Sequence, residues 1–280
     1  MLRLMAHWWW YLQKTLEPDK AGRMKQAYPI LEYDPTREAM IEPDMLVQPI
    51  DNIPEHCVIC FFQDVIEQMA QRGDLKEITA RNSEMGRQVL YGFQYDGQPL
   101  ALFHPGIGAP LAVALLEEAI ALGCKKFIAC GGSGVLDSSI AVGRLLIPIS
   151  AVRDEGTSYH YLPPGREVQA SPEAVAAIER VLQQRKIDYL LIKTWTTDSP
   201  YRETPQKIAL RKSENCQVVE MEAAAFFAVA EFRRVQLAQI LYGGDDVGGE
   251  DWDRRDWQSR QTIREELVWL AAEACLGIGK

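Results

Sequence analysis

The sequence predicts a single α/β domain with a central, largely buried sheet flanked by helices. Two observations predict it. From about residue 57 onward, short runs that are apolar throughout alternate with longer amphipathic segments, and glycine or proline separates the two kinds of segment. Runs without a polar face are typical of strands that are covered on both sides.

The strand candidates are continuous apolar runs bounded by turn residues. The pair Asp96-Gly97 stands just before one of these runs and is a typical hairpin turn. Because each run is too short for an average helix and carries no helical stripe, we read it as a strand. We expect strands at about 57–62, 98–104, 125–132, 144–152, 188–197, 216–221 and 236–244.

The helix candidates carry apolar residues at helical spacing and recognisable start signals. Pro110, Pro172 and Pro205 each stand at a first helical position, where a missing N–H has no cost. Ser171 and Thr204 precede two of these prolines as N-cap residues. We expect helices at about 110–123, 171–186, 204–215 and 257–275, and a buried alanine-rich helix after residue 222.

The composition is that of an ordinary globular protein. The chain has 280 residues, of which 47% are hydrophobic and 25% charged, so it can bury a sizeable core. Its formal net charge is −9, whereas non-specific nucleic-acid binding needs a basic face that neutralises phosphates. We therefore expect no nucleic-acid partner, while a small anionic substrate stays compatible with a locally positive pocket.

Residues 1–50 are predicted to be an N-terminal extension to a domain formed by residues 51–280. The apolar start of this extension, which includes Trp8, Trp9 and Trp10, is too short to span a bilayer and lacks a small-residue cleavage site. We expect these tryptophans to pack on the body or on a partner subunit, with contact to a membrane surface as the alternative. The sequence thus predicts no membrane partner and a cytoplasmic location.

Two of the six cysteines, Cys57 and Cys60, form a C-x-x-C pair. On a strand, side chains three positions apart face opposite sides, which is a poor arrangement for binding a metal. No second pair follows at zinc spacing. We therefore expect core cysteines and no metal site.

Three segments whose residues could take part in binding or catalysis stand at the carboxyl ends of predicted strands, where α/β sheets bind ligands. The first, "ACGGSGVLDSS", contains Gly132 and Ser133, which can aim backbone N–H groups and a hydroxyl at an anion. A tight turn without a ligand is the structural alternative.

The second segment, "EMEAAAF", holds Glu220 and Glu222 around Met221. An ionised carboxylate accepts two hydrogen bonds at once, and the vicinal diol of a sugar offers two donors at matching spacing. We expect the helix dipole to keep Glu222 ionised. The alternative is that acids are simply favoured in a first helical turn.

The third segment, "ILYGGDDVGGEDWD", places Asp245 and Asp246 directly after a strand. Adjacent carboxylates point in different directions, so one can face a pocket while the other braces the loop. A carboxyl group that holds a proton can protonate a leaving group. Turn chemistry, which favours aspartate and glycine equally, is the alternative.

Taken together, the sequence from about residue 55 to 275 resembles the nucleoside phosphorylase family, which includes uridine phosphorylase, bacterial purine nucleoside phosphorylase and the methylthioadenosine nucleosidases. Four stretches carry the resemblance in the family's order: "HPGIGAPLAVALLEEAIALG", "ACGGSGVLDSSIAVGRLLIP", "VVEMEAAAFFAVA" and "LYGGDDVGG". The resemblance implies a mixed central sheet, cleavage of an N-glycosidic bond, no cofactor, and a homo-oligomer, either a dimer or a hexamer.

The resemblance also implies roles for single residues. Asp245, with Asp246 as the alternative, would protonate the departing base. The remaining assignments are ribose contacts from Glu222, Met221 and Glu220, phosphate contacts from Gly132, Ser133 and a neighbouring subunit's Arg87, and base contacts from Asp198, Tyr201 and Arg202. For Glu220 we expect either support of the loop or contact with the same edge of the sugar.

Two departures from the family pattern concern the nucleophile. The family's glycine-aspartate-proline loop with its arginine reads "CFFQDVIEQ" here, and Ala129 stands where uridine phosphorylases carry an arginine. We expect phosphorolysis with inorganic phosphate, giving free base and ribose 1-phosphate. The alternatives are hydrolysis by water, for which Gln63 and Asp64 are the nearest polar residues to the water-activating position, and a nucleoside-binding protein without catalysis.

Overall fold

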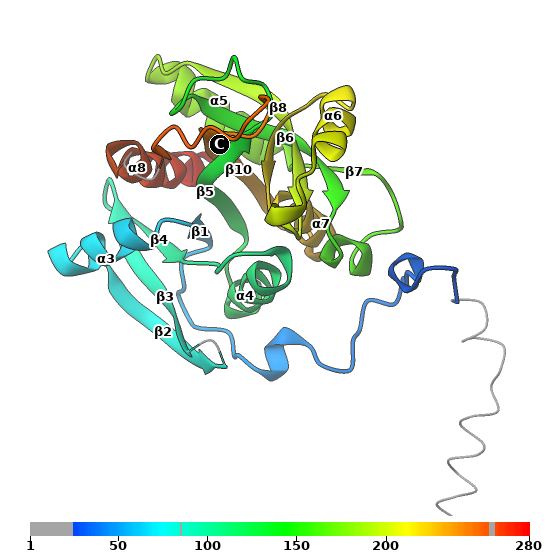
Figure 1. The fold of residues 1–280 in the computed structure, drawn as a ribbon. Coiled ribbons are helices and arrows are strands. Elements are labelled where there is room, and N and C mark those ends of the chain that lie inside the picture. Colours follow the sequence, from blue (N-terminus) through cyan, green and yellow to red (C-terminus); the bar gives the residue numbers. More distant parts are fainter. Residues whose placement is uncertain (1–24, 85, 258–260) are drawn as a thin grey trace, which may run out of the picture.

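The computed structural model describes residues 25–84, 86–257 and 261–280 (Figure 1). Within these residues ten strands form one mixed sheet, three more than the seven strands expected. The single domain with a central mixed sheet is thus confirmed. The tryptophans at positions 8 to 10 lie outside the described residues. The strands are β1 (His56–Cys60), β2 (Lys76–Ser83), β3 (Gly86–Tyr95), β4 (Gln98–Phe103), β5 (Lys126–Val135), β6 (Leu145–Asp154), β7 (Glu167–Gln169), β8 (Tyr189–Thr197), β9 (Cys216–Glu220) and β10 (Gln236–Asp246).

Strand β10 closes part of the sheet into a barrel. It pairs in parallel with β5 and antiparallel with β6, so the path β10-β6-β8-β9-β5 returns to its start. Strands β1, β4, β3 and β2 extend the sheet outward from β5, and the β3–β4 hairpin turns at the predicted Asp96-Gly97. Barrel closure brings the carboxyl ends of β5, β9 and β10 together.

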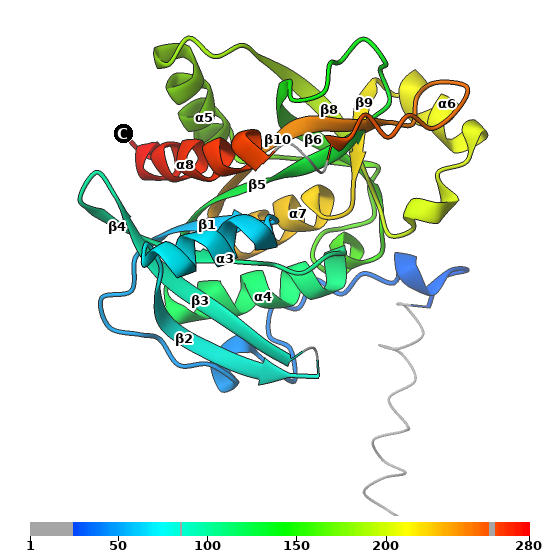
Figure 2. The ribbon, with the colours of Figure 1, turned by 60° about the vertical axis from the view of Figure 1, so that its left-hand side comes forward.

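Helices cover both sides of the central strands (Figure 2). Helices α5 and α8 pack against each other and on β5 and β10, while α4 packs on α7 on the other side. All seven predicted apolar strands and all five predicted helices are present. The helices are α3 (Gln63–Arg72), α4 (Ala109–Leu122), α5 (Pro172–Gln184), α6 (Pro205–Ser213), α7 (Ala223–Arg233) and α8 (Gln261–Gly277).

Some local predictions were wrong. Gly132 and Ser133 lie within β5, where they pair with Tyr242 and Gly243 of β10, so they are not part of a loop that follows the strand. Ser171 precedes α5 but makes no cap bond, because its hydroxyl accepts from the backbone N–H of Leu237. Thr204 does cap α6, through the N–H of Lys207.

The cysteines are part of the core. Cys57 and Cys60 are fully buried in β1, and all six cysteines are buried and free, in line with the prediction from the apolar runs. Burial raises the pKa of the Cys57 thiol well above its ordinary value, which keeps the group neutral. Among the described residues, no helix is both long and apolar enough to cross a bilayer.

The described part of the segment before β1, residues 25–55, lies on the surface of the body. It contains two single-turn 3-10 helices, Pro29–Leu31 and Pro43–Met45. Arg233 of α7 holds it by an ion pair of 3.2 Å with Glu42. Several of its apolar side chains stay exposed in the single chain, among them Met40 at 94% and Ile41 at 69%.

Candidate active site

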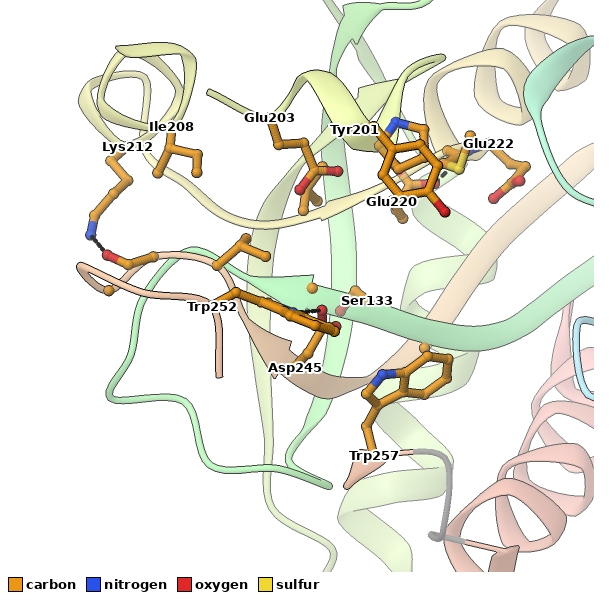
Figure 3. A pocket seen from close by; sticks show the side chains of 18 of the residues that line it. Ser133, Tyr201, Glu203, Ile208, Lys212, Glu220, Glu222, Asp245, Trp252 and Trp257 are labelled. Carbon is orange, nitrogen blue, oxygen red and sulfur yellow. Dashed lines mark hydrogen bonds between the residues drawn. The ribbon is translucent and has the colours of Figure 1, made fainter. Parts of the chain in front are cut away.

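A pocket of about 1240 Å³ opens where β5, β9 and β10 end (Figure 3). Gly132 and Ser133 of β5 form part of its wall, together with the 220–222 segment and Asp245. Several residues of the segment 200–205, among them Glu203, and the loop 247–252 line it as well. The three segments that the sequence singled out therefore line one cavity.

Glu220 supports the start of α7. Its Oε1 accepts from the hydroxyls of Thr196 (2.6 Å) and Thr194 (3.2 Å) on β8. Its Oε2 accepts from the backbone N–H groups of Glu222 (2.7 Å) and Ala223 (2.6 Å), which would otherwise be unpaired at the helix end. Since both oxygens are already engaged, the arrangement favours loop support over the ribose contact that the family resemblance implied.

Glu222 occupies the N-cap position of α7, is 5% exposed and is one of the residues that line the pocket. Its Oε1 accepts from the N–H of Gly108 at 2.6 Å, and within the described residues it makes no ion pair. Burial, followed by the nearby charge of Glu220, raises its pKa to about 8. The expectation that the helix dipole keeps Glu222 ionised was therefore wrong, because desolvation outweighs it.

The two adjacent aspartates divide their tasks. Asp246 is buried, bonded to Arg255 Nη2 at 2.5 Å and to the N–H of Gly248 at 2.8 Å, so it braces the loop. Asp245 lines the pocket, and its Oδ2 accepts from the indole N–H of Trp252 at 2.7 Å. Of these two aspartates, Asp245 is therefore part of the pocket wall and Asp246 is not.

The predicted base-binding residues are spread out. Tyr201 lines the rim of the pocket with 97% of its surface exposed. Asp198 accepts from the N–H of Gly156 and, like Arg202, is not part of the pocket wall. Glu203, which the sequence reading passed over, does line the pocket. Burial and then the charge of Asp245 raise the pKa of Glu203 to about 7.

The wall around Gly132 and Ser133 carries little positive charge. The Ser133 hydroxyl donates to the Tyr242 carbonyl at 3.3 Å, and the Phe61 ring would lie 3.1 Å from a Cβ added at Gly131. Arg87 pairs with Glu77 on the distant β2–β3 hairpin. Neither Gln63 nor Asp64 reaches the pocket wall.

Acidic side chains outnumber basic ones in the described pocket wall. Both basic groups already have partners, since Lys212 Nζ donates to the Gly248 carbonyl (3.2 Å) and Arg264 pairs with Asp64 (2.8 Å). The pocket therefore favours ligands that bring hydrogen-bond donors. The acids are Glu203, Glu220, Glu222, Asp245, Glu250 and Asp251, against Lys212 and Arg264.

Fold and pocket together define an α/β protein with an acid-lined cavity at the carboxyl ends of its strands, which is where such sheets usually hold their ligands. The chain belongs to the phosphorylase superfamily, whose family model matches residues 55–274. The predicted kinship with nucleoside phosphorylases is thereby confirmed.

Two of the curated relatives match over most of their own length, and the second is purine nucleoside phosphorylase DeoD-type 1 from Shewanella oneidensis, 24% identical over 207 residues, which cover 73% of this chain and 85% of that protein. The first has the higher identity. It is guanosine phosphorylase from Halorubrum lacusprofundi, 28% identical over 203 residues, which cover 71% of this chain and 81% of that protein. Several uridine phosphorylases match over 28% to 60% of their own length.

Two solved structures share the fold. Purine nucleoside phosphorylase from Toxoplasma gondii, in complex with immucillin-H, aligns with a TM-score of 0.70 and 23% identity, covering 85% of this chain and 97% of that one. AMP nucleosidase from Bacteroides thetaiotaomicron aligns with a TM-score of 0.63 and 21% identity, covering 80% and 87%. At these identities the likeness concerns the fold.

Proposed function

We propose that this protein cleaves the N-glycosidic bond of a nucleoside. The observation that carries the proposal is the shared cavity, in which Glu222 and Met221 line the same space as Asp245 and Glu203. Glu222 would hold the ribose hydroxyls and Met221 would pack on the sugar. Asp245 would protonate, or hydrogen-bond, the departing base, which eases the build-up of oxocarbenium character on the ribose.

We propose a purine with several N–H groups as the base. A carboxylate accepts hydrogen bonds and, when ionised, donates none, so a base that meets the ionised form of Glu203 has to supply donors to it. Guanine presents two adjacent donors, its N1–H and its 2-amino group, which match the two oxygens of one carboxylate. The name of the Halorubrum lacusprofundi relative, guanosine phosphorylase, supports the same substrate.

Replacing Glu203 with glutamine tests the choice of base. The amide offers one acceptor and one donor where the carboxylate offers two acceptors, so E203Q is expected to lower kcat/KM for guanosine about 10- to 100-fold. Inosine lacks the 2-amino group, so its kcat/KM should fall less than that of guanosine. Steady-state rates of base release from both nucleosides give the guanosine-to-inosine ratio.

Glu250 provides the matched control for this test. It lines the same pocket as Glu203 but is exposed, so E250Q removes an equal charge from the wall without removing a buried acceptor. E250Q should leave the guanosine-to-inosine ratio as it is in the wild type. An unchanged ratio in E203Q as well would remove Glu203 from base recognition.

As nucleophile we propose inorganic phosphate, which would give free base and ribose 1-phosphate. The phosphorylase names of the curated relatives support phosphate, and so does the position of Gly132 and Ser133 in the pocket wall. Arg87 is exposed on its hairpin and would have to come from a neighbouring subunit. We accordingly propose a cytoplasmic homo-oligomer, a dimer or a hexamer, with shared sites.

Hydrolysis by water is the second candidate, and a specific observation favours it. Lys212 and Arg264, the cationic side chains of the described pocket wall, both have partners, and Ala129 supplies none on β5. A dianion without cations loses strong charge-assisted hydrogen bonds, whereas water needs no such partners.

A panel of nucleosides incubated with and without phosphate separates the two candidates. We expect release of free base to depend on added phosphate, with ribose 1-phosphate as the second product. Release at an equal rate without phosphate, with free ribose as product, would establish hydrolysis instead. No release from any nucleoside under either condition would contradict the proposed function itself.

A further inference from the structure

Trp252 stands on a short loop that is pinned to the end of β10. Asp246 and Asp253 exchange two backbone hydrogen bonds, of 2.8 and 2.9 Å, and so close the loop at its base. The Asp246–Arg255 ion pair fixes the same point. Gly248 has to be glycine, since a Cβ there would lie 1.9 Å from the Leu136 carbonyl oxygen. Trp252 is therefore held in place by the fold of the loop.

The indole of Trp252 combines an exposed ring with an engaged polar atom. The residue is 64% exposed, yet its Nε1–H donates to Asp245 Oδ2 at 2.7 Å (Figure 3). Among the described residues, the other carboxylate oxygen of Asp245 has no hydrogen-bond donor. It lies 3.7 Å from where a Cβ at Gly134 would stand, on the pocket side of β5.

A carboxylate at this place needs a restraint. The last torsion of an aspartate side chain is soft, so the group turns easily unless one oxygen is fixed. The carboxylate of Glu203 lies across the same pocket and interacts with Asp245 as a like charge (Figure 3). An indole N–H restrains an oxygen without bringing the charge of an arginine or lysine.

We propose that Trp252 is a positioning residue for Asp245. The indole N–H of Trp252 holds Oδ2 of Asp245, so that Oδ1 of Asp245 faces the leaving base. The inference rests on the proposed function, because positioning matters only if Asp245 assists the departure of a base. Trp252 acts through Asp245, and a merely structural tryptophan would lack this dependence on the leaving group.

Trp252→Phe tests the proposal with two substrates. The variant keeps an aromatic ring and loses the N–H. For guanosine we expect kcat to fall about 10- to 100-fold while KM changes less than about threefold, since a misplaced acid affects the transition state more than binding. For 7-methylguanosine, whose base already carries the positive charge and leaves without a proton, we expect rates within about threefold of the wild type.

Three further variants make the result specific. Trp257→Phe changes the other indole of the pocket wall, and the ratio of the two substrates should stay as in the wild type. Trp252→His keeps a ring N–H and should recover part of the lost guanosine turnover. In an Asp245→Ala background, Trp252→Phe should have no further effect on guanosine, because the partner of the N–H is gone.

Equal losses with guanosine and 7-methylguanosine in Trp252→Phe would overturn the proposal, because they would show a general disturbance of the pocket. A further loss in the Asp245→Ala background would overturn it as well. If the wild type released base from neither nucleoside, the proposed function would fall and this inference with it.

Discussion

Replacing Glu222 with glutamine is expected to lower kcat/KM for guanosine about a thousandfold and, at the same time, to stabilise the folded chain at pH 8. The loss of activity follows from the proposed hold on the ribose. A hydrogen bond to a charged group is worth about 1.5–3 kcal/mol, and Glu222, which loses its proton as the pH approaches 8, would accept one in its ionised form from each of two hydroxyls. Steady-state release of free guanine measures this part of the prediction.

The gain in stability follows from the pKa of Glu222. Burial, and then Glu220, raise it to about 8 from an ordinary value of 4.5. Because the folded state binds this proton more tightly than the unfolded state, the stabilisation is complete below pH 4.5 and is lost as the pH rises towards 8. Glutamine has no proton to lose, so we expect E222Q to gain about 2–4 kcal/mol over the wild type at pH 8.

Urea unfolding at pH 8 and pH 5 measures this difference. The advantage of E222Q should be clear at pH 8 and small at pH 5, where Glu222 of the wild type also carries its proton in the folded chain. A variant that is less stable than the wild type at pH 8 would contradict the role of burial at this site. Together, the two halves describe a side chain that costs stability and is retained for a ligand.

Replacing Asp245 with asparagine is expected to lower guanosine turnover about 10²- to 10⁴-fold, since an amide cannot pass a proton to the leaving base. Binding should change little, because the amide keeps an acceptor in the same place. Isothermal titration of guanosine gives the affinity, and base release gives the rate. Unchanged turnover would remove Asp245 from the mechanism and would leave a nucleoside-binding protein as the better description.

Asp246→Asn is the control for this variant. Asp246 is buried and bonded to Arg255, so its loss should lower the melting temperature of the protein. The two adjacent carboxylates are thus expected to affect different measurements. If D246N lost turnover while its melting temperature stayed that of the wild type, Asp246 and not Asp245 would be the residue that acts on the base.

The sequence predicted those elements whose signals are local. Runs that are apolar on both faces, and prolines at first helical positions, are read within a few residues, and the strands and helices predicted from them are present. Helix α3 was missed because its N-cap residue, Phe62, offers no capping side chain. Strand β2 was missed because its residues are exposed or only partly buried, so no clear alternation marks them.

The extension of β5 shows a long-range effect that the sequence does not display. Gly131, Gly132 and Gly134 suggest a loop, because glycine usually separates strands. The structure keeps them in the strand, because β10 pairs with β5 as far as its end, more than a hundred residues later in the chain. Barrel closure therefore decides the conformation of this segment.

The candidate site was predicted in outline, through Glu222, Met221 and Asp245. The sequence did not show which acid of each neighbouring pair is engaged by other residues and which is left for a ligand. Glu220 is engaged because the threonines of β8 come to lie beside it, and Asp246 because Arg255 does. Glu203 was missed for the same reason, since its raised pKa arises from burial and from Asp245, which is distant in the chain.

A crystal structure of the D245N variant with guanosine tests the central claim most directly, because slow turnover would leave the nucleoside intact. We expect the two ribose hydroxyls to lie on the carboxylate of Glu222 and the guanine ring to lie between Glu203 and residue 245. A nucleoside whose ribose lies away from Glu222, or which binds outside this pocket, would contradict it.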